Sequence, residues 1–269
     1  MSDDRGVVPS PVDGVEIAYE ASGSGDPLVL LHGSALSRAI WRGLGYVRAL
    51  RDTHRVVLVD LRGHGRSGKP TAPEAYAMGT VTADVAAVLD ALDIARADVF
   101  GYSFGGRTAL SLATEHPDRV RRLVLGGASS AAQAGSFDRL FFSGCVDVLE
   151  RSGVEGFLDG WEERRGSEVD AATAAAFRAN DAAALAAYMR RMDVEPGIAD
   201  DALARVTAPT LVLVGSRDHE RISDAEHPAA TIPDARLTVV DGADHGTMLA
   251  HRDEVLDAVA PFLGDPISS

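Results

Sequence analysis

The sequence predicts an α/β fold built on a mostly parallel, doubly wound sheet. Between residues 14 and 125, short apolar runs rich in β-branched residues alternate with helical patterns. Alternating strands and helices are typical of a parallel sheet. Most of the runs are almost continuously apolar, which indicates strands covered by helices on both faces. A length of 269 residues suits one large unit of this class.

Seven runs are predicted to be strands: Val15–Tyr19, Pro27–Leu31, Val56–Asp60, Asp98–Tyr102, Leu123–Leu125, Thr210–Val214 and Leu237–Val240. A helix is predicted over Val81–Leu92, because its valines and leucines recur on one helical face. A second helix covers Arg107–Glu115 and is stopped by Pro117, and a third closes the chain near Asp253–Phe262.

The segment 131–205 is different, because it is rich in alanine and contains no clear strand pattern. Helices are predicted within it over Val169–Arg178 and Asp181–Met192. Strand patterns resume only after this segment. We therefore predict a core made of residues 1–130 and 206–269, with residues 131–205 inserted into it as a helical cap, or lid.

The charge balance is acidic, with 40 Asp and Glu against 26 Lys and Arg and a formal net charge of −14. This balance argues against nucleic acid or an anionic membrane as the main partner, because both bind basic surfaces. The N-terminal residues are polar and acidic, so a secretory leader is not expected, and no apolar window is long enough to span a bilayer. We therefore expect a soluble cytoplasmic protein that acts on a small molecule, and the oligomeric state stays open.

The single cysteine, Cys145, leaves no intrachain disulfide framework and no cysteine cluster for zinc. No adjacent histidine supports it as a nucleophile, so we expect a small buried apolar residue. No metal-ligand cluster, dinucleotide fingerprint or phosphate-binding loop is recognisable, and neither a metal nor another cofactor is expected.

The stretch GYSFG at residues 101–105 places a serine between two glycines, where a strand pattern ends and a helix pattern begins. A strand that turns at once into a helix makes a tight corner, and glycine removes side chains that would collide there. Ser103 would then stand above the sheet at a helix N-terminus, whose dipole favours developing negative charge. This arrangement predicts Ser103 as a nucleophile.

A serine nucleophile needs a base, and a third group must orient that base. His245 is predicted to be the base, because it lies in a glycine-flanked loop after the last predicted strand. Asp218 follows the preceding strand and is predicted to orient the imidazole, which gives the chain order Ser, Asp, His. Asp241 is a rival for this role, and Asp244 is a weaker one because adjacent side chains diverge.

The backbone N–H groups of Phe104 and Ser34 are predicted to form an oxyanion hole. Phe104 directly follows the serine, and Ser34 lies just beyond the strand that ends at Leu31. His32, in the same loop, is expected to brace it by hydrogen bonding.

Together these segments resemble the α/β-hydrolase fold family, in particular its small, capped, single-domain members. Five blocks carry the resemblance: His32-Gly33, DLRGHGRS at residues 60–67, Gly101-x-Ser103-x-Gly105, Gly215-x-x-Asp218 and Asp244-His245-Gly246. The resemblance implies an eight-stranded, mostly parallel sheet with the cap over Ser103. It also implies that His64 and Arg66 are structural, since their loop lies beside the active site.

The nucleophile separates branches of this family. Haloalkane dehalogenases and epoxide hydrolases have aspartate there, so Ser103 indicates acyl chemistry. Lipases often carry an HGGG-type loop, and carbon–carbon bond hydrolases commonly show a glycine-proline-glycine run after the HG pair. The sequence HGSALS at residues 32–37 has neither.

The resemblance therefore implies a serine hydrolase that cleaves a small, fairly hydrophobic ester or lactone through an acyl-enzyme on Ser103. The same triad would serve a carbon–carbon bond hydrolase or a cofactor-free perhydrolase similar to the haloperoxidases. A ligand receptor that keeps the triad is a further alternative, which repeated turnover would exclude. Large apolar cap residues are the candidates for substrate binding: Phe141, Phe142, Phe157, Trp161, Tyr188 and Met192.

Overall fold

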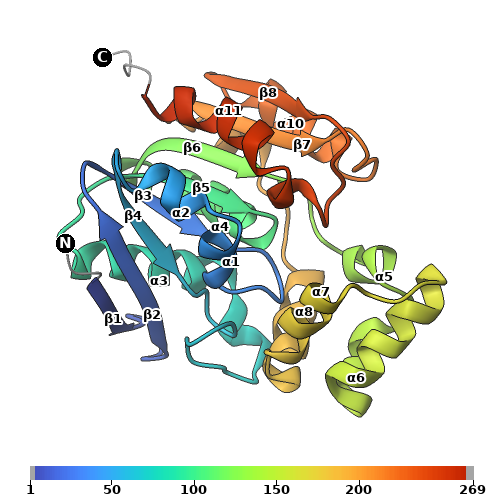
Figure 1. The fold of residues 1–269 in the computed structure, drawn as a ribbon. Coiled ribbons are helices and arrows are strands. Elements are labelled where there is room, and N and C mark those ends of the chain that lie inside the picture. Colours follow the sequence, from blue (N-terminus) through green and yellow to red (C-terminus); the bar gives the residue numbers. More distant parts are fainter. Residues whose placement is uncertain (1–3, 265–269) are drawn as a thin grey trace.

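An eight-stranded sheet forms the centre of the computed structural model, which describes residues 4–264 (Figure 1). The strands lie in the order β1-β2-β4-β3-β5-β6-β7-β8. The β1–β2 and β2–β4 pairs are antiparallel, and the other pairs are parallel. The predicted fold class is therefore confirmed. The strands are β1 (Asp4–Pro9), β2 (Glu16–Gly23), β3 (Asp26–Leu31), β4 (His54–Val59), β5 (Ala97–Tyr102), β6 (Val120–Gly126), β7 (Thr210–Gly215) and β8 (Ala235–Val240).

The edge strand β1 is the one strand that the sequence pattern did not predict. Among its six residues only Val8 is buried, so it carries no apolar alternation or continuous apolar run. It pairs with β2 alone, residue for residue from Asp4 opposite Ala21 to Pro9 opposite Glu16.

Helices cover both faces of the sheet and divide its side chains between two cores. In β3, Val29 and Leu31 belong to one core, whereas Leu28 and Leu30 belong to the other. The first core packs against α3, α4 and α10, and the second packs against α1, α2 and α11. These helices are α1 (Ala39–Gly43), α2 (Tyr46–Leu50), α3 (Met78–Ala91), α4 (Phe104–Glu115), α10 (Ile222–Thr231) and α11 (Arg252–Gly264), with 3-10 turns η1 (Pro73–Tyr76), η2 (Pro117–Arg119) and η3 (Met248–Ala250).

The parallel strands end level with one another at one edge of the sheet. Leu31 of β3 pairs with Gly101 of β5, and Gly215 of β7 pairs with Val240 of β8. Side chains that directly follow these strands are therefore delivered to the same edge. All the predicted triad and oxyanion residues follow one of these four strands.

Between β6 and β7, a stretch that the structure describes in full, every regular element is a helix (Figure 1). Asp170 and Asp181 cap two of the helices, each accepting hydrogen bonds from backbone N–H groups of the first turn. The predicted helix ends lie within two residues of the observed ones. The helices are α5 (Ser136–Leu140), α6 (Cys145–Arg165), α7 (Ala171–Arg178), α8 (Ala182–Asp193) and α9 (Asp200–Leu203). The helix α6 had not been predicted, and it bends at Gly153, where φ is 68°.

Buried polar contacts hold the loop that follows β4. Arg62 is fully buried, and its Nε and Nη2 donate to the two carboxylate oxygens of Asp84 at 2.6 and 2.9 Å. Its Nη1 donates to Asp13 at 2.9 Å. His64 is also fully buried and lies 3.0 Å, through Nδ1, from the carbonyl oxygen of Arg62. These contacts support the structural role expected of His64, whereas Arg66 is exposed.

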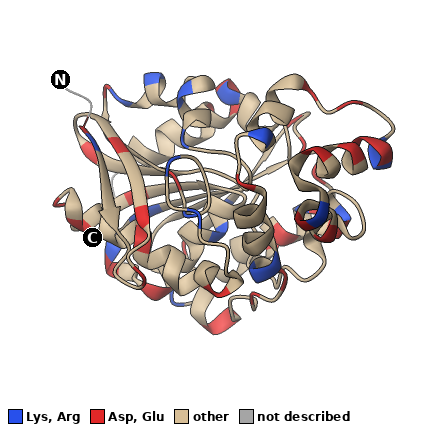
Figure 2. Cartoon of the chain, turned by 90° about the horizontal axis from the view of Figure 1, so that it is seen from below, with Lys and Arg blue, Asp and Glu red and all other residues tan. Residues whose placement is uncertain are grey.

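Charged residues are spread over the outer helices and loops, and most of the central sheet is free of them (Figure 2). Among the described helices, none combines the length and the apolar composition that crossing a bilayer requires.

Candidate active site

Ser103 occupies the corner between β5 and α4 in a strained backbone conformation. Its φ is 53° and its ψ is −113°, and its N–H donates to the carbonyl oxygen of Gly126 at 2.7 Å. A side chain on Gly101 would lie 2.1 Å from the oxygen of Gly105, and one on Gly105 would lie 2.2 Å from the oxygen of Leu31. Both glycines are therefore required by the close approach of the backbone. The corner leaves the Ser103 hydroxyl at the N-terminus of α4.

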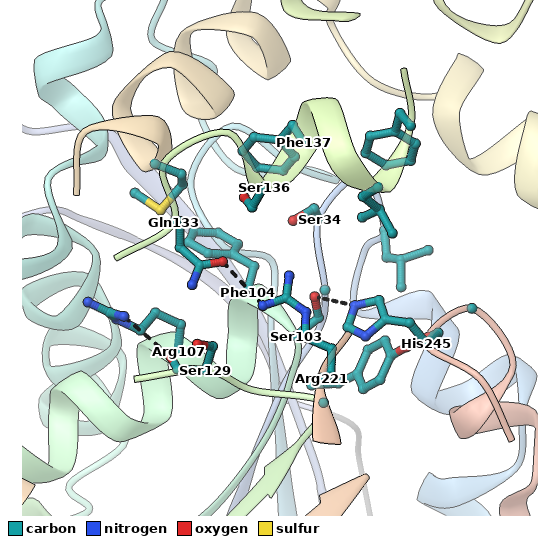
Figure 3. A pocket seen from close by; sticks show the side chains of 18 of the residues that line it. Ser34, Ser103, Phe104, Arg107, Ser129, Gln133, Ser136, Phe137, Arg221 and His245 are labelled. Atoms are coloured by element: carbon teal, nitrogen blue, oxygen red, sulfur yellow. Dashed lines mark hydrogen bonds between the residues drawn. The ribbon is translucent and has the colours of Figure 1, made fainter. Parts of the chain in front are cut away.

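The hydroxyl of Ser103 lies beside an imidazole, and a carboxylate lies behind that imidazole. Ser103 Oγ is 3.0 Å from His245 Nε2, and His245 Nδ1 is 2.9 Å from Asp218 Oδ2 (Figure 3). The side chains of His245 and Asp218 are 16% and 7% exposed. The Tyr102 ring stacks on the imidazole with centroids 5.6 Å apart, and its hydroxyl donates to the carbonyl oxygen of His245. These contacts orient the imidazole between acid and hydroxyl.

The two rival aspartates make other contacts. Asp241 accepts a hydrogen bond from the Ser216 hydroxyl at 3.1 Å. Asp244 accepts from the backbone N–H and the hydroxyl of Thr247 at 2.9 and 2.8 Å. Of these three aspartates, Asp218 alone contacts the imidazole of His245 through its side chain.

Two backbone donors predicted for an oxyanion hole line the same cavity as Ser103. Within residues 4–264, the N–H groups of Ser34 and Phe104 have no intramolecular acceptor. The Ser34 hydroxyl lies 2.6 Å from the hydroxyl of Tyr188 on α8, and Asn180 donates to the carbonyl oxygen of Ala35 at 2.8 Å. The loop that carries Ser34 is therefore attached to the segment between β6 and β7.

His32 braces this loop by hydrogen bonding, as expected. Its Nδ1–H donates to the carbonyl oxygen of Gly33 at 2.8 Å, and its Nε2 accepts from the N–H of Leu61 at 3.1 Å. Burial lowers its pKa to about 4, so the ring is neutral and can make both contacts.

A cavity of about 230 Å³ opens above Ser103, and apolar side chains from the segment between β6 and β7 form much of its wall. Four predicted substrate-binding residues line it: Phe141, Trp161, Tyr188 and Met192. Phe142 and Phe157 do not, and the prediction of their place was wrong. Phe157 is fully buried between other aromatic rings, and Phe142 packs over Gly160. The sequence could not separate cavity-lining from internally packed aromatics, because both recur at helical spacing.

Two cavity residues, Arg107 and Arg221, were missed by the sequence analysis. The four-residue spacing between Ser103 and Arg107 could have indicated the position of Arg107, because residues four apart lie on the same side of a helix such as α4. Arg221 follows Asp218 by three residues, and nothing in the sequence distinguished it from a surface arginine. Gln133, also in the wall, lies 3.4 Å from Arg221 (Figure 3).

Cys145 lies away from this cavity. It is fully buried, and burial together with the nearby Asp138 raises the pKa of its thiol to about 12. A thiol in this environment stays protonated and is a poor nucleophile, as the sequence suggested.

Sequence comparison matches residues 26–151 to a family model described as alpha/beta hydrolase fold. A 2-hydroxymuconate semialdehyde hydrolase from Pseudomonas sp. (strain CF600) is 40% identical over 120 residues, which cover 44% of this chain and 42% of that enzyme. The chain therefore matches less than half the length of this relative. A putative non-heme haloperoxidase from Mycobacterium phage D29 is 29% identical over 94% of this chain and 93% of the relative.

Solved structures match the chain over nearly its whole length. A hydrolase from Pseudomonas aeruginosa PA01 superposes with a TM-score of 0.80 at 29% identity, covering 97% of this chain and 99% of that one. An N-acyl homoserine lactone degrading enzyme superposes with a TM-score of 0.77 at 28% identity, covering 96% and 100%. With the family model, the sheet order and the five sequence blocks in agreement, the chain has the α/β-hydrolase fold.

Proposed function

We propose that this protein is a serine hydrolase that cleaves a small ester or lactone through an acyl-enzyme on Ser103. The observation that carries the proposal is the continuous contact from Ser103 Oγ through the His245 imidazole to Asp218, at 3.0 and 2.9 Å. A hydroxyl, an imidazole and a carboxylate in this order are the groups that activated serine chemistry needs.

In the first half-reaction, Ser103 Oγ attacks the substrate carbonyl while its proton passes to His245 Nε2. Asp218 accepts the hydrogen bond from Nδ1–H and stabilises the imidazolium that forms. The N–H groups of Phe104 and Ser34 hold the oxyanion, and losing one such donor costs about 2.7–4 kcal/mol of transition-state stabilisation. His245 then protonates the leaving alkoxide.

In the second half-reaction, water attacks the acyl-enzyme and His245 takes a proton from it. Collapse of the tetrahedral intermediate breaks the bond to Ser103 Oγ, which regains its proton from His245. The products are a carboxylic acid and an alcohol, or a hydroxy acid from a lactone. No cofactor enters these steps. Residues 131–205 act as the cap that encloses the substrate, over a core of residues 1–130 and 206–269.

The test is turnover of chromogenic esters and lactones of increasing size by the native protein and by the Ser103→Ala variant. We expect multiple turnovers by the native protein and a loss of about 10³-fold or more in kcat for the variant, with an unchanged fold by circular dichroism. An exposed serine, Ser167, provides the matched control Ser167→Ala, which should keep full activity. Full turnover by Ser103→Ala would refute the proposal.

A carbon–carbon bond hydrolase is the second candidate, and the 40% identity to the semialdehyde hydrolase over 120 residues favours it. The same triad would activate water or the serine toward a ketone instead of an ester. If the ester and lactone panel gives no turnover, a second assay decides between ester hydrolysis and carbon–carbon bond hydrolysis. It offers vinylogous 1,5-diketones as substrates and measures their cleavage as a loss of visible absorbance. Haloperoxidase-like perhydrolysis, suggested by the relative from phage D29, would require hydrogen peroxide in the same assay.

A further inference from the structure

Two arginines in the wall of the active-site cavity have no role in the hydrolysis of a neutral ester. Arg107 lies on α4, and Arg221 lies between β7 and α10. Figure 3 shows the guanidinium of Arg221 beside Ser103, the guanidinium of Arg107 beyond Ser129, and Phe137 on the side of the cavity formed by α5.

Arg107 is 6% exposed, and its side chain donates hydrogen bonds to neutral backbone groups. Its terminal nitrogens donate to the carbonyl oxygens of Ser129, Ala131 and Pro196 at 3.3, 2.9 and 2.5 Å. Its Nε is buried and has no partner within the described residues. A guanidinium has five N–H donors, so these contacts leave part of the group unsatisfied. Burying an unpaired donor is unfavourable.

No carboxylate within residues 4–264 contacts Arg107. Two acids act on it from a distance and have partners of their own: Glu195 contacts Arg191 at 2.7 Å, and Glu115 accepts a hydrogen bond from Thr82 at 2.7 Å. Burial lowers the pKa of Arg107 from its usual value, and the two glutamates oppose this shift. The guanidinium stays charged, so the cavity wall holds a desolvated cation without a direct counterion.

Arg221 retains free donors as well. Its Nη1 contacts Asp224 at 3.0 Å and Gln133 at 3.4 Å, and its other nitrogens have no acceptor in the described part of the chain. Its side chain is 17% exposed, at the cavity. Arg221 is therefore a half-neutralised cation with N–H groups available to a ligand.

Arginines that serve the fold are paired differently in this chain. Arg62 contacts the carboxylates of Asp84 and Asp13, and Arg121 contacts those of Asp98 and Asp26. Each of these structural arginines contacts two acids. Arg107 contacts none: its three acceptors are backbone carbonyl oxygens, which leave its charge without a direct counterion.

We infer that the substrate carries a carboxylate, which the guanidinium groups of Arg107 and Arg221 bind while Ser103 attacks its ester or lactone carbonyl; this inference rests on the proposed function. A carboxylate is planar and accepts paired N–H donors, which suits guanidinium. The substrate class is thus a small acidic ester or lactone whose apolar part lies against the aromatic wall.

The first experiment compares two esters of equal size, 4-nitrophenyl hydrogen adipate and its neutral amide, with spontaneous hydrolysis subtracted. We expect the native protein to show a kcat/KM at least tenfold higher for the acid. This ratio should fall about tenfold or more in Arg221→Met and in Arg107→Gln, the loss typical of a charged hydrogen bond. Arg164→Met, which removes an exposed arginine outside the cavity, should keep the ratio. Equal rates for the two esters with the native protein would overturn the inference and leave the serine hydrolase intact.

The second experiment measures binding without turnover. Calorimetry with the Ser103→Ala protein should show monomethyl adipate binding at least tenfold more tightly than methyl adipamate. Arg221→Met in the same background should remove this difference, and it provides the test if Arg107→Gln fails to fold. Equal binding would refute the carboxylate site. Preferential binding of the acid together with silence of the native protein toward all esters would refute the proposed hydrolysis and leave the anion site standing.

Discussion

At the scale of single residues, Ser103, the proposed nucleophile, has a strained backbone conformation. A φ of 53° with a ψ of −113° is a conformation that residues with a Cβ rarely adopt. Such a conformation costs about 1–3 kcal/mol, and the surrounding structure must impose it. Here the imposing groups are the hydrogen bond from Ser103 to Gly126 and the tight packing of Gly105 against β3. The corner is therefore less stable than an ordinary loop would be.

This strain predicts a difference in stability between two inactive variants. Ser103→Gly should be more stable than Ser103→Ala by about 1 kcal/mol, because glycine adopts positive φ without steric conflict. Both variants should be inactive. Thermal unfolding followed by circular dichroism is the measurement, with a difference in Tm of about 2–4 °C for a chain of this size. Equal melting temperatures would show that the corner stores no strain.

Some positions at this scale could be predicted from sequence. Ser103, Asp218 and His245 each follow a strand pattern, and parallel strands bring their carboxyl ends together. Their proximity was therefore predictable, although their catalytic roles stay a proposal. The position of the Arg221 side chain could not be predicted from the sequence, because the direction of a long side chain on a loop depends on the residues that pack around it.

At the scale of elements, α8 holds the loop that presents the Ser34 N–H. Tyr188 on α8 is buried, contacts the Ser34 hydroxyl at 2.6 Å and packs on Phe104 with ring centroids 4.5 Å apart. The two proposed oxyanion donors thus share one neighbour from the segment above them. Motion of α8 would displace the loop that carries Ser34.

Removing the hydroxyl of Tyr188 should therefore lower kcat more than it raises KM. For Tyr188→Phe we expect a fall in kcat of about fivefold to tenfold, the effect of one hydrogen bond of about 1 kcal/mol. Tyr46→Phe is the matched control, since its hydroxyl donates to Leu249 in the other core, and its kinetics should match the native protein. A change confined to KM would indicate a role in substrate contact and not in loop position.

Elements were predictable where periodicity was strong. The core strands are continuous apolar runs, and α7 and α8 begin at aspartate caps, so their positions could be read from sequence. The edge strand β1 exposes most of its residues, and α6 bends at Gly153. In both cases the stabilising contacts come from neighbours and leave only a weak local pattern.

At the scale of the whole molecule, two buried histidines join neighbouring loops at the sheet edge. The rings of His32 and His64 lie 5.3 Å apart, and both residues are fully buried. Burial lowers their pKa values to about 4 and about 3. The unfolded chain protonates its histidines near pH 6.5. Below that pH the unfolded state binds more protons than the folded state, so stability falls as the pH falls.

The free energy of unfolding should accordingly decrease between pH 6.5 and pH 4. Each histidine contributes up to about 1.4 kcal/mol per pH unit to the slope in this window. His64→Asn should make the slope shallower by about that amount, whereas the exposed His219→Gln should leave it unchanged. Urea unfolding at several pH values measures this slope. Identical slopes for His64→Asn and the native protein would contradict the prediction.

The backbone hydrogen bond from Ile198 to Ser130, at 2.8 Å, and the contacts of Arg107 with Ala131 and Pro196 bring together the two places where the chain leaves and re-enters the sheet layer. The segment between Ser130 and Ile198 is therefore a loop with fixed ends, and these ends keep their positions when the sequence between them changes. Doubling the length of such a loop adds only about 0.6 kcal/mol to its closure entropy. Because these ends are fixed, evolution can replace the whole segment between β6 and β7, and with it the substrate preference, without changing the residues at the edge of the sheet.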